Sequence, residues 1–239
     1  MAMTPVPQSG PEDGCLFSLG GRAEEGAVDQ TDAALRPAVF IDKDGTLLEN
    51  LPYNVDPDRM RFVPHAIEAL KLLVAFDYVL VVVTNQPGIA LGHFDQPALR
   101  ALEQALTARL AEAGVPLAGF YACPHAPPKD PAFACACRKP APGLLLAAAD
   151  VHAIDLGRSW MVGDILDDIE AGRRAGCRTL LLDVGNETEW RYAPQRVPHA
   201  RVHDLFEAAR RIVAHDLEHR AQRSTFTRER TACASPAQR

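Results

Sequence analysis

The sequence predicts an α/β fold built on a single doubly wound parallel sheet with helices on both faces. Short apolar segments such as residues 38–41 and 78–83 lack the alternation of apolar and polar side chains that a half-exposed strand shows. Longer segments with apolar residues at helical spacing, such as residues 64–76, lie between them. Strands that are buried on both faces and alternate with helices indicate a parallel sheet covered on both sides.

The elements have recognisable boundaries along the chain. Pro64 suits the first turn of a helix that presents Ile67 and Leu70 on one face. Asp95 caps the next helix and Gly114 ends it. We expect strands at 39–41, 78–83, 119–122, 159–162 and 178–182, and helices at 64–76, 97–113, 142–151, 167–175 and 202–214. This order is that of a Rossmann-like sheet, in which ligands bind at the carboxyl ends of the strands.

Composition divides the chain into one domain and two tails. Residues 1–35 are rich in Gly, Pro, Ala and acids without a sustained period, which predicts a disordered extension. Residues 36–218 form the expected domain. Residues 219–239 carry five arginines against one acid and end in Ser, Pro, Ala and Gln, and we expect a second disordered tail there.

The overall charge and hydropathy exclude several classes of function. The 239 residues are 47% hydrophobic, which is ample for a core, and carry a formal net charge of −6. An acidic domain without a basic stripe disfavours nucleic acid as a partner. No apolar run approaches the roughly 20 residues of a membrane helix. The N-terminus also lacks the pattern of a secretory signal, so we expect a cytoplasmic protein.

Polar residues gather where the predicted strands end. The four segments concerned are residues 42–46, 84–86, 138–140 and 163–168. An Asp-x-Asp pair alone most often forms a turn, and Thr84-Asn85 alone can merely cap the next segment. Because the carboxyl ends of parallel strands lie at one edge of the sheet, however, the four segments together predict one site.

In their order, these segments resemble the four motifs of the haloacid dehalogenase superfamily of phosphatases. The resemblance covers about residues 37–185 and is carried by DKDGT from Asp42, Thr84, Lys139 and GDILDD from Gly163. It implies that Asp42 is the nucleophile, forming an aspartyl-phosphate, and that Asp44 is the general acid and base. Thr84 and Lys139 would hold and neutralise the phosphoryl group. The implied Mg²⁺ ligands are Asp42, the backbone carbonyl of Asp44, and Asp164. Asp168 would orient these groups without binding the metal itself.

Three cysteines and a histidine lie close together between the third and fourth motifs. Cys123, His125, Cys135 and Cys137 are the ligand types of a closed, tetrahedral structural zinc site. Their spacing is tighter than that of common zinc knuckles, and unbound thiols beside a proline-rich loop are the alternative. We expect a structural Zn²⁺ that organises the loop 123–137 and thereby positions Lys139.

The stretch from Cys123 to Gly143 is similar to the branch of the superfamily that contains heptose-bisphosphate and histidinol-phosphate phosphatases. This implies a small phosphorylated sugar as substrate, with heptose 1,7-bisphosphate at its 7-position as the leading expectation. Histidinol phosphate, or a zinc-stabilised binding module without catalysis, are the alternatives. Ile165 stands where some heptose enzymes have a lysine, which keeps the first alternative open.

The same resemblance implies the residues that bind substrate and the form of the enzyme. The expected substrate-binding residues are Asn50, Tyr53, Thr84, Asn85, Arg138 and Lys139. The loops after the first two motifs are short, so no separate cap domain is expected, and the family implies a monomer. Lys43 is expected to point away from Asp42 and to take no part.

Overall fold

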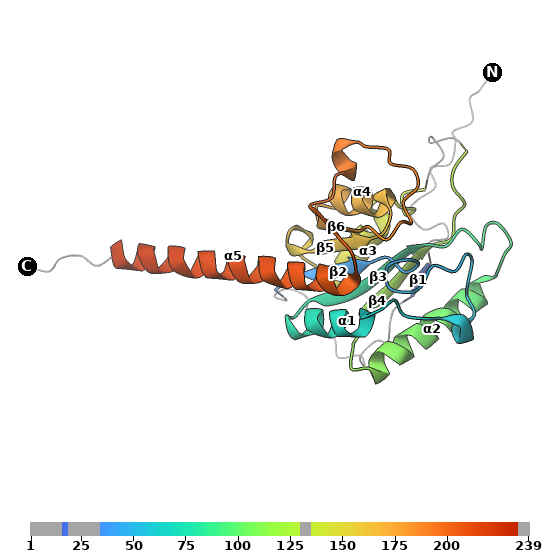
Figure 1. Cartoon of the computed structure of the whole chain (residues 1–239), viewed down its shortest axis with the longest axis horizontal. Coiled ribbons are helices and arrows are strands. Elements are labelled where there is room, and N and C mark those ends of the chain that lie inside the picture. Colours follow the sequence, from blue (N-terminus) through green and yellow to red (C-terminus); the bar gives the residue numbers. More distant parts are fainter. Residues whose placement is uncertain (1–15, 19–33, 130–134, 234–239) are drawn as a thin grey trace, which may run out of the picture.

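The computed structural model describes residues 16–18, 34–129 and 135–233 and contains a sheet of seven strands (Figure 1). The strand order is β1-β4-β3-β2-β5-β6-β7. The six strands from β2 to β7 are parallel, and β1 pairs with β4 in the antiparallel direction. The predicted doubly wound α/β fold is therefore confirmed.

The predicted elements occur in the predicted order, with boundaries that differ by at most three residues except at the end of α5, which continues far beyond the predicted residue 214. The strands are β1 (Leu16–Ser18), β2 (Ala38–Ile41), β3 (Val79–Asn85), β4 (Gly119–Cys123), β5 (Trp160–Gly163), β6 (Arg178–Leu182) and β7 (Ala200–Val202). The helices are α1 (Ala66–Ala75), α2 (Gln96–Glu112), α3 (Gly143–His152), α4 (Leu166–Arg174) and α5 (Leu205–Cys233). The first helix starts two residues after Pro64, because His65 takes a left-handed conformation there.

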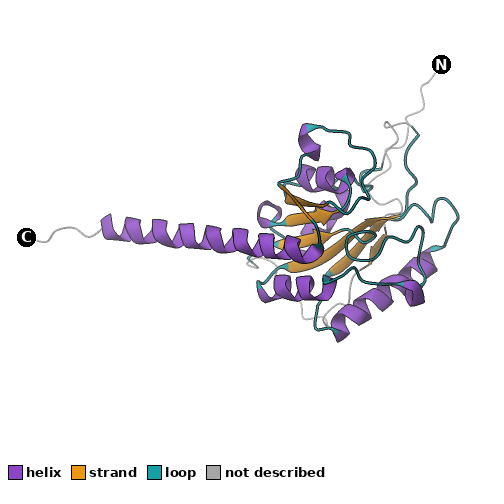
Figure 2. Cartoon of the chain, viewed as in Figure 1, coloured by secondary structure: helices purple, strands orange, loops and turns teal. Residues whose placement is uncertain are grey.

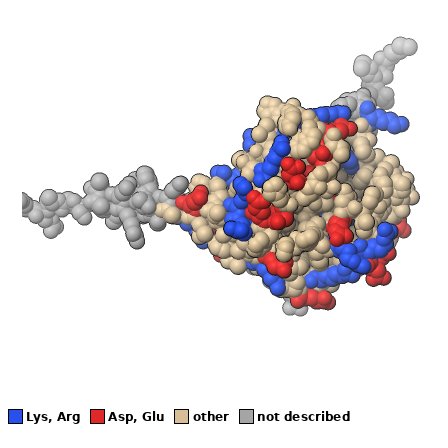
Figure 3. Space-filling view, viewed as in Figure 1, with Lys and Arg blue, Asp and Glu red and all other residues tan. Residues whose placement is uncertain are grey.

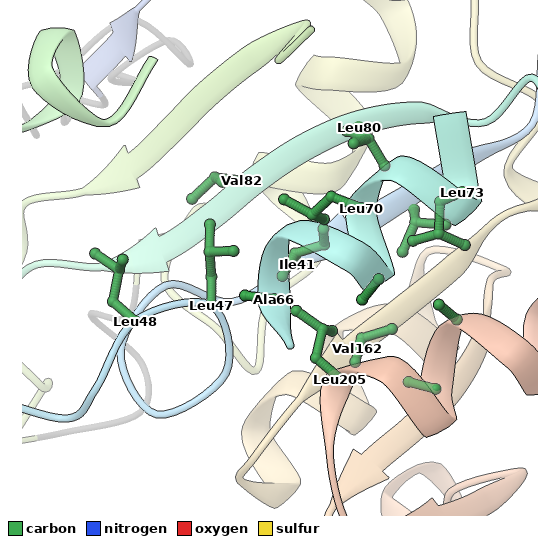
Figure 4. Close-up of a cluster of buried hydrophobic side chains, with 14 of the residues drawn as sticks. Ile41, Leu47, Leu48, Ala66, Leu70, Leu73, Leu80, Val82, Val162 and Leu205 are labelled. Carbon is green, nitrogen blue, oxygen red and sulfur yellow. The ribbon is translucent and has the colours of Figure 1, made fainter. Parts of the chain in front are cut away.

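Helices pack on both faces of the sheet and form two apolar layers (Figure 2). Helices α1, α2 and α5 cover one face, and α3 and α4 cover the other. In the first layer, Ile41 and Val82 of the sheet lie against Leu70 of α1 and Leu205 of α5 (Figure 4). Because successive residues of a strand point to opposite faces, Phe40 and Val81 belong to the second layer.

The strand order reverses beside β2, and this reversal positions the site. From β2 the chain builds outwards through β3 and β4, and then returns to the other side of β2 with β5. The carboxyl ends of β2 and β5 are adjacent, with Ile41 opposite Val162. Crevices for ligands form at such a reversal. In the described chain, residues 42–65 form a loop with one short 3₁₀ turn, so no cap domain is inserted there.

Both expected tails contain regular structure in the described residues. Leu16–Ser18, within the expected disordered extension, adds β1 to the edge of the sheet beside β4. Helix α5 begins near the predicted position but continues to Cys233, so most of the expected disordered tail is helical and projects from the domain (Figure 1). No proline or glycine interrupts residues 205–233, and pairs such as Arg220–Asp216 at 2.8 Å support the helix at i,i+4 spacing. Residues 1–15, 19–33 and 234–239 lie outside the described part of the chain.

The surface carries charges of both signs. Figure 3 shows acidic and basic side chains interspersed over the face in view, with no continuous basic stripe on it. Among the helices that the structure describes, none is long and apolar enough to cross a membrane.

Candidate active site and cysteine cluster

The loop after β2 presents Asp42 and Asp44 at the reversal of the strand order. Main-chain pairing continues one residue beyond the strand, since the Asp42 N–H donates to the Val162 carbonyl at 3.0 Å. Gly45 then turns the chain with a φ of +87°. A Cβ at Gly45 would lie 2.2 Å from a carboxylate oxygen of Asp164, so both conformation and space require glycine. The two acids are thus held beside the end of β5.

Lys139 reaches Asp42 from a segment far along the chain. Its buried ammonium lies 2.5 Å from Asp42 Oδ1 and 2.7 Å from Asp168 Oδ1, and donates to the Val83 carbonyl at 2.9 Å. Asn85 holds the main chain of Lys139, accepting from its N–H and donating to its carbonyl, both at 3.0 Å. The side-chain amide of Asn85, expected to bind substrate, is therefore engaged in positioning Lys139.

Asp44 is held by two side chains to which the sequence analysis gave no role in the site. Gln86 donates to Asp44 Oδ2 and to Thr84 Oγ1, both at 2.9 Å. Lys43, expected to take no part, lies 2.8 Å from Asp44 Oδ1 and is 1% exposed. A lysine buried at this position needs a counter-charge, and the neighbouring carboxylate is the one within reach.

Asp164 and Asp168 complete the site from the end of β5 and the start of α4. Thr46 donates to Asp164 Oδ1 at 3.2 Å, and the Asn186 amide donates to Asp164 Oδ2 at 2.7 Å. Asp168 accepts from the Ile165 N–H at 3.3 Å and is fully buried beside Lys139. Asn186 follows the end of β6, and the rule on strand ends is the signal that could have identified it.

The buried carboxylates repel one another and resist ionisation. Burial raises the pKa of Asp42 to about 7, opposed by the Lys139 charge and reinforced by Asp168 and Asp44. Burial likewise raises the pKa of Asp164 to about 6, with Asp42 adding to the shift, and the pKa of Asp168 to about 6. Burial acts to lower the pKa of Lys139, but Asp168 and Asp42 outweigh it and hold that pKa above its ordinary value. A single ammonium thus faces several carboxylates.

This surplus of negative charge fits a divalent cation. Oxygen atoms of Asp42, Asp164 and Asp168 all lie within 4.8 Å of one another. Opposite ligands of an octahedral Mg²⁺ are separated by about 4.2 Å, and Mg²⁺ prefers such hard oxygen donors. Asp168 already pairs with Lys139, which leaves Asp42 and Asp164 as the carboxylates better placed to hold the metal.

We expect Mg²⁺ to stabilise the protein more at pH 8 than at pH 5. The raised pKa values mean that the folded, metal-free state holds protons that the unfolded state releases near pH 4. The stability from these groups is present below about pH 4 and is lost as the pH rises through about 6 to 7. Mg²⁺ binds the deprotonated carboxylates, so its effect grows over the same range. Thermal unfolding with and without Mg²⁺ at both pH values measures this, and an equal shift at both would contradict it.

Cys123, His125, Cys135 and Cys137 come together in a compact cluster. The Cys137 sulfur lies 3.3 Å from that of Cys123, 3.4 Å from that of Cys135 and 3.3 Å from His125 Nδ1. The sulfurs of Cys123 and Cys135 are 3.7 Å apart. Zinc–sulfur bonds of about 2.3 Å place sulfurs about 3.8 Å apart at the corners of a tetrahedron, so four donors at this spacing suit Zn²⁺. The hydrogen bond from Cys137 lowers the pKa of Cys123 to about 5 against the effect of burial, which favours the thiolate that a metal needs.

The cluster is joined to the active site through Arg138 and Lys139. The Arg138 N–H donates to the Cys135 sulfur at 3.3 Å, and the Arg138 guanidinium donates to the His125 carbonyl at 3.0 Å. One nitrogen of the Arg138 guanidinium therefore binds the loop that carries the cluster, and only the remaining N–H groups are available to a substrate. Lys139 follows directly, so the cluster and the ammonium at Asp42 share one short segment.

Asn50 and Tyr53 lie on the exposed part of the loop after β2. Asn50 is exposed, and Tyr53 is 48% exposed with a positive φ of 53°. The Tyr53 ring stacks on His93, with ring centroids 4.0 Å apart. His93 lies in the loop after β3 and was not predicted, because an isolated histidine in a loop carries no signal in the sequence.

Sequence comparisons identify phosphatases as relatives. The profile of the HAD-hydrolase-like family matches residues 136–208. The chain is 40% identical over 149 residues to the D-glycero-beta-D-manno-heptose-1,7-bisphosphate 7-phosphatase of Salmonella typhi, which covers 61% of this chain and 79% of that protein. It is 41% identical over 150 residues to the Pasteurella multocida protein of the same name, covering 62% and 82% of the two chains.

Solved structures resemble the whole domain. A structure described as that of a HAD-like phosphatase from Mesorhizobium loti is 32% identical, with a TM-score of 0.65, and the match covers 87% of this chain and 98% of that one. The D,D-heptose 1,7-bisphosphate phosphatase from B. bronchiseptica, complexed with magnesium and phosphate, is 29% identical with a TM-score of 0.62. That match covers 76% of this chain and 99% of the other.

Proposed function

Because the chain belongs to the HAD-like phosphatase family, we propose that it hydrolyses the 7-phosphate of D-glycero-D-manno-heptose 1,7-bisphosphate. One observation carries the proposal: Asp42, Lys139, Asp164 and Asp168, from separate segments of the chain, converge in a buried site beside Asp44. The names of the relatives supply the substrate.

In the first step, a carboxylate oxygen of Asp42 attacks phosphorus in line with the leaving oxygen. The new P–O bond forms an aspartyl-phosphate, and the bond from phosphorus to the sugar oxygen breaks. Asp44 transfers its proton to that sugar oxygen, which leaves as an alcohol. Gln86 and Lys43 fix the Asp44 carboxyl for this transfer. Lys139 fixes Asp42 and offsets the negative charge that gathers around phosphorus.

In the second step, water replaces Asp42 on phosphorus. Asp44 now accepts a proton from the water as its oxygen bonds to phosphorus, and the bond to Asp42 breaks. Inorganic phosphate leaves, and both aspartates regain their starting state. When bound by Asp42, Asp164 and the Asp44 carbonyl, Mg²⁺ supplies positive charge for the phosphoryl oxygens. Asp168 and Asn85 act by positioning Lys139, and Asn186 by orienting Asp164.

Zinc has a structural role in this proposal. Four protein donors close its tetrahedron and leave no open position for substrate. Arg138, held at His125 by one nitrogen, retains other N–H groups for the second phosphate or the sugar hydroxyls. Tyr53 and Asn50 lie on the exposed loop that would border the substrate. Cysteines that bind a metal rather than form disulfides suit a reducing compartment, so we propose a cytoplasmic location for the enzyme.

The substrate assignment is tested by a ranking of kcat/KM values. We expect heptose 1,7-bisphosphate, assayed as each anomer, to exceed histidinol phosphate and p-nitrophenyl phosphate. One additional hydrogen bond to a charged group is worth about 1.5–3 kcal/mol, so the margin is at least about tenfold. The aryl phosphate is the control for intact chemistry, since it requires the same aspartates and no second phosphate. A higher kcat/KM for histidinol phosphate would overturn the substrate and leave the reaction type standing.

A further inference from the structure

A cavity of about 210 Å³ lies at the end of the sheet opposite the active site. Pro37 precedes β2, Tyr78 precedes β3, Arg158 precedes β5 and Arg178 begins β6, so the cavity lies at the amino ends of these strands. Helix α5 closes it with His215, Asp216, His219 and Arg220. The four residues of β2, at about 3.3 Å each, separate it from Asp42 by roughly 13 Å. Nothing in the proposed reaction uses this cavity.

Its lining is predominantly cationic. Asp216 is the one acid that lines it, and Arg220 pairs with that acid at 2.8 Å. Within the described part of the chain, neither Arg158 nor Arg178 has a carboxylate within 4 Å. Glu218 also faces His215 from α5. Two arginine charges therefore remain unbalanced in the cavity, and two histidines stand beside them.

The histidines and Arg178 are ordered by packing. The rings of His215 and His219 lie 4.3 Å apart, one helical turn from each other. The ring centroids of His215 and the buried Trp160 are 5.2 Å apart with the rings nearly perpendicular, and the Arg178 guanidinium lies 5.7 Å from the centre of the Trp160 ring. Burial lowers the pKa of His215, and Arg178 and His219 lower it further. The unpaired positive charge in the cavity is therefore that of Arg158 and Arg178, because the one acid that lines it, Asp216, already pairs with Arg220.

We propose that this cavity is a second anion-binding site, which takes a phosphate group, free or as a small monoester. Arg158 and Arg178 provide charged N–H donors that match phosphate oxygens. His215, His219 and the Tyr78 hydroxyl provide further polar atoms around the cavity. The cavity volume is below the roughly 300–1,000 Å³ of sites for drug-sized ligands, so the ligand is limited to the size of phosphate or a small monoester. A bound phosphate joins α5 to strands β5 and β6 through opposite charges.

Trp160 gives this site a direct readout, because it lies beside His215 and Arg178. The chain has two tryptophans, so a Trp190→Phe background leaves Trp160 as the single emitter. Inorganic phosphate, titrated with Mg²⁺ omitted, is expected to change the Trp160 fluorescence saturably. Chloride at the same ionic strength is expected to leave it unchanged. A parallel titration with glycerol 1-phosphate distinguishes the free ion from a monoester. The ligand with the lower Kd is the form that the cavity prefers.

Variants assign the signal to the cavity. Arg158→Gln is expected to weaken phosphate binding about tenfold or more, as the loss of one charge-assisted hydrogen bond does. Arg211→Gln is the matched control on α5, because Arg211 pairs with Glu207 outside the cavity, and it should bind phosphate as the parent does. Arg178→Gln repeats the test at the other arginine. The proposal is overturned if both cavity variants, shown by circular dichroism to be folded, bind phosphate like the parent, or if phosphate produces no saturable change. Asp42 is untouched throughout, so either result leaves the proposed phosphatase activity standing.

Discussion

Replacing Asp42 with asparagine is expected to lower kcat by roughly 10⁵-fold or more, the loss seen when a nucleophile is removed elsewhere. The amide is a poor nucleophile toward phosphorus, while its oxygen still accepts from the Lys139 ammonium. The fold should persist, because Lys139 keeps Asp168 at 2.7 Å and the Val83 carbonyl at 2.9 Å. Steady-state rates on heptose 1,7-bisphosphate and the aryl phosphate, with a thermal melt of each variant, measure both expectations.

Asp167→Asn is the matched control for this change. Asp167 lies beside Asp168 at the start of α4, but its carboxylate pairs with Arg196 at 2.9 Å, whereas Lys139 pairs with Asp42 and Asp168. Its loss should leave kcat within about twofold, since it removes a partly exposed ion pair of small energy. Substantial turnover by a folded Asp42→Asn protein would show that Asp42 is not the nucleophile.

Replacing Cys135 with alanine is expected to abolish stoichiometric zinc binding and to destabilise the domain by roughly 4 kcal/mol or more, the range that loss of a metal reaches. In a domain of this size that corresponds to a fall in Tm of roughly 10 °C. Activity should fall as well, because the Arg138 N–H donates to the Cys135 sulfur and Lys139 is the next residue. Metal analysis of the purified protein and thermal unfolding measure the two effects.

Cys177→Ala separates the loss of zinc from the loss of a buried thiol. Cys177 is 4% exposed and lies outside the cluster, so its truncation removes packing and leaves the zinc content unchanged. We expect it to cost about 1 kcal/mol. Equal Tm values for the Cys135 and Cys177 variants, or a parent protein that contains no zinc, would show that the cluster is not a structural metal site.

The fold was predictable because its signals are local. Apolar strands such as 78–83 are short, uninterrupted and separated by helices with clear caps, and the structure follows this order. β1 and β7 escaped prediction because three-residue strands at the edges of a sheet have no period to detect. The length of α5 was not predicted because the excess of arginines in residues 219–239 was taken to indicate a disordered tail, whereas the absence of proline and glycine from residues 205–233 and i,i+4 ion pairs favour a helix.

Within the site, residues at strand ends were predictable and their supporting contacts were not. Asp42, Asp164 and Lys139 belong to motifs, and the structure brings their side chains together. Gln86 and Asn186 act through contacts across 42 and 22 positions of sequence, which a linear pattern does not record. Lys43 was expected to point away from Asp42, and this expectation did not consider its contact with the neighbouring Asp44 carboxylate at 2.8 Å.

The nucleophilic role of Asp42 is the central claim, and trapping the phosphoenzyme tests it most directly. The Mg²⁺-loaded enzyme is mixed with heptose 1,7-bisphosphate, quenched within one turnover and treated with borohydride, which reduces an aspartyl-phosphate to homoserine. Mass spectrometry of the peptide that contains residues 42–44 then locates the reduced position. We predict homoserine at position 42, dependent on substrate and absent from Asp42→Asn. Reduction at Asp44 or Asp164, or none while phosphate is being released, would contradict the account.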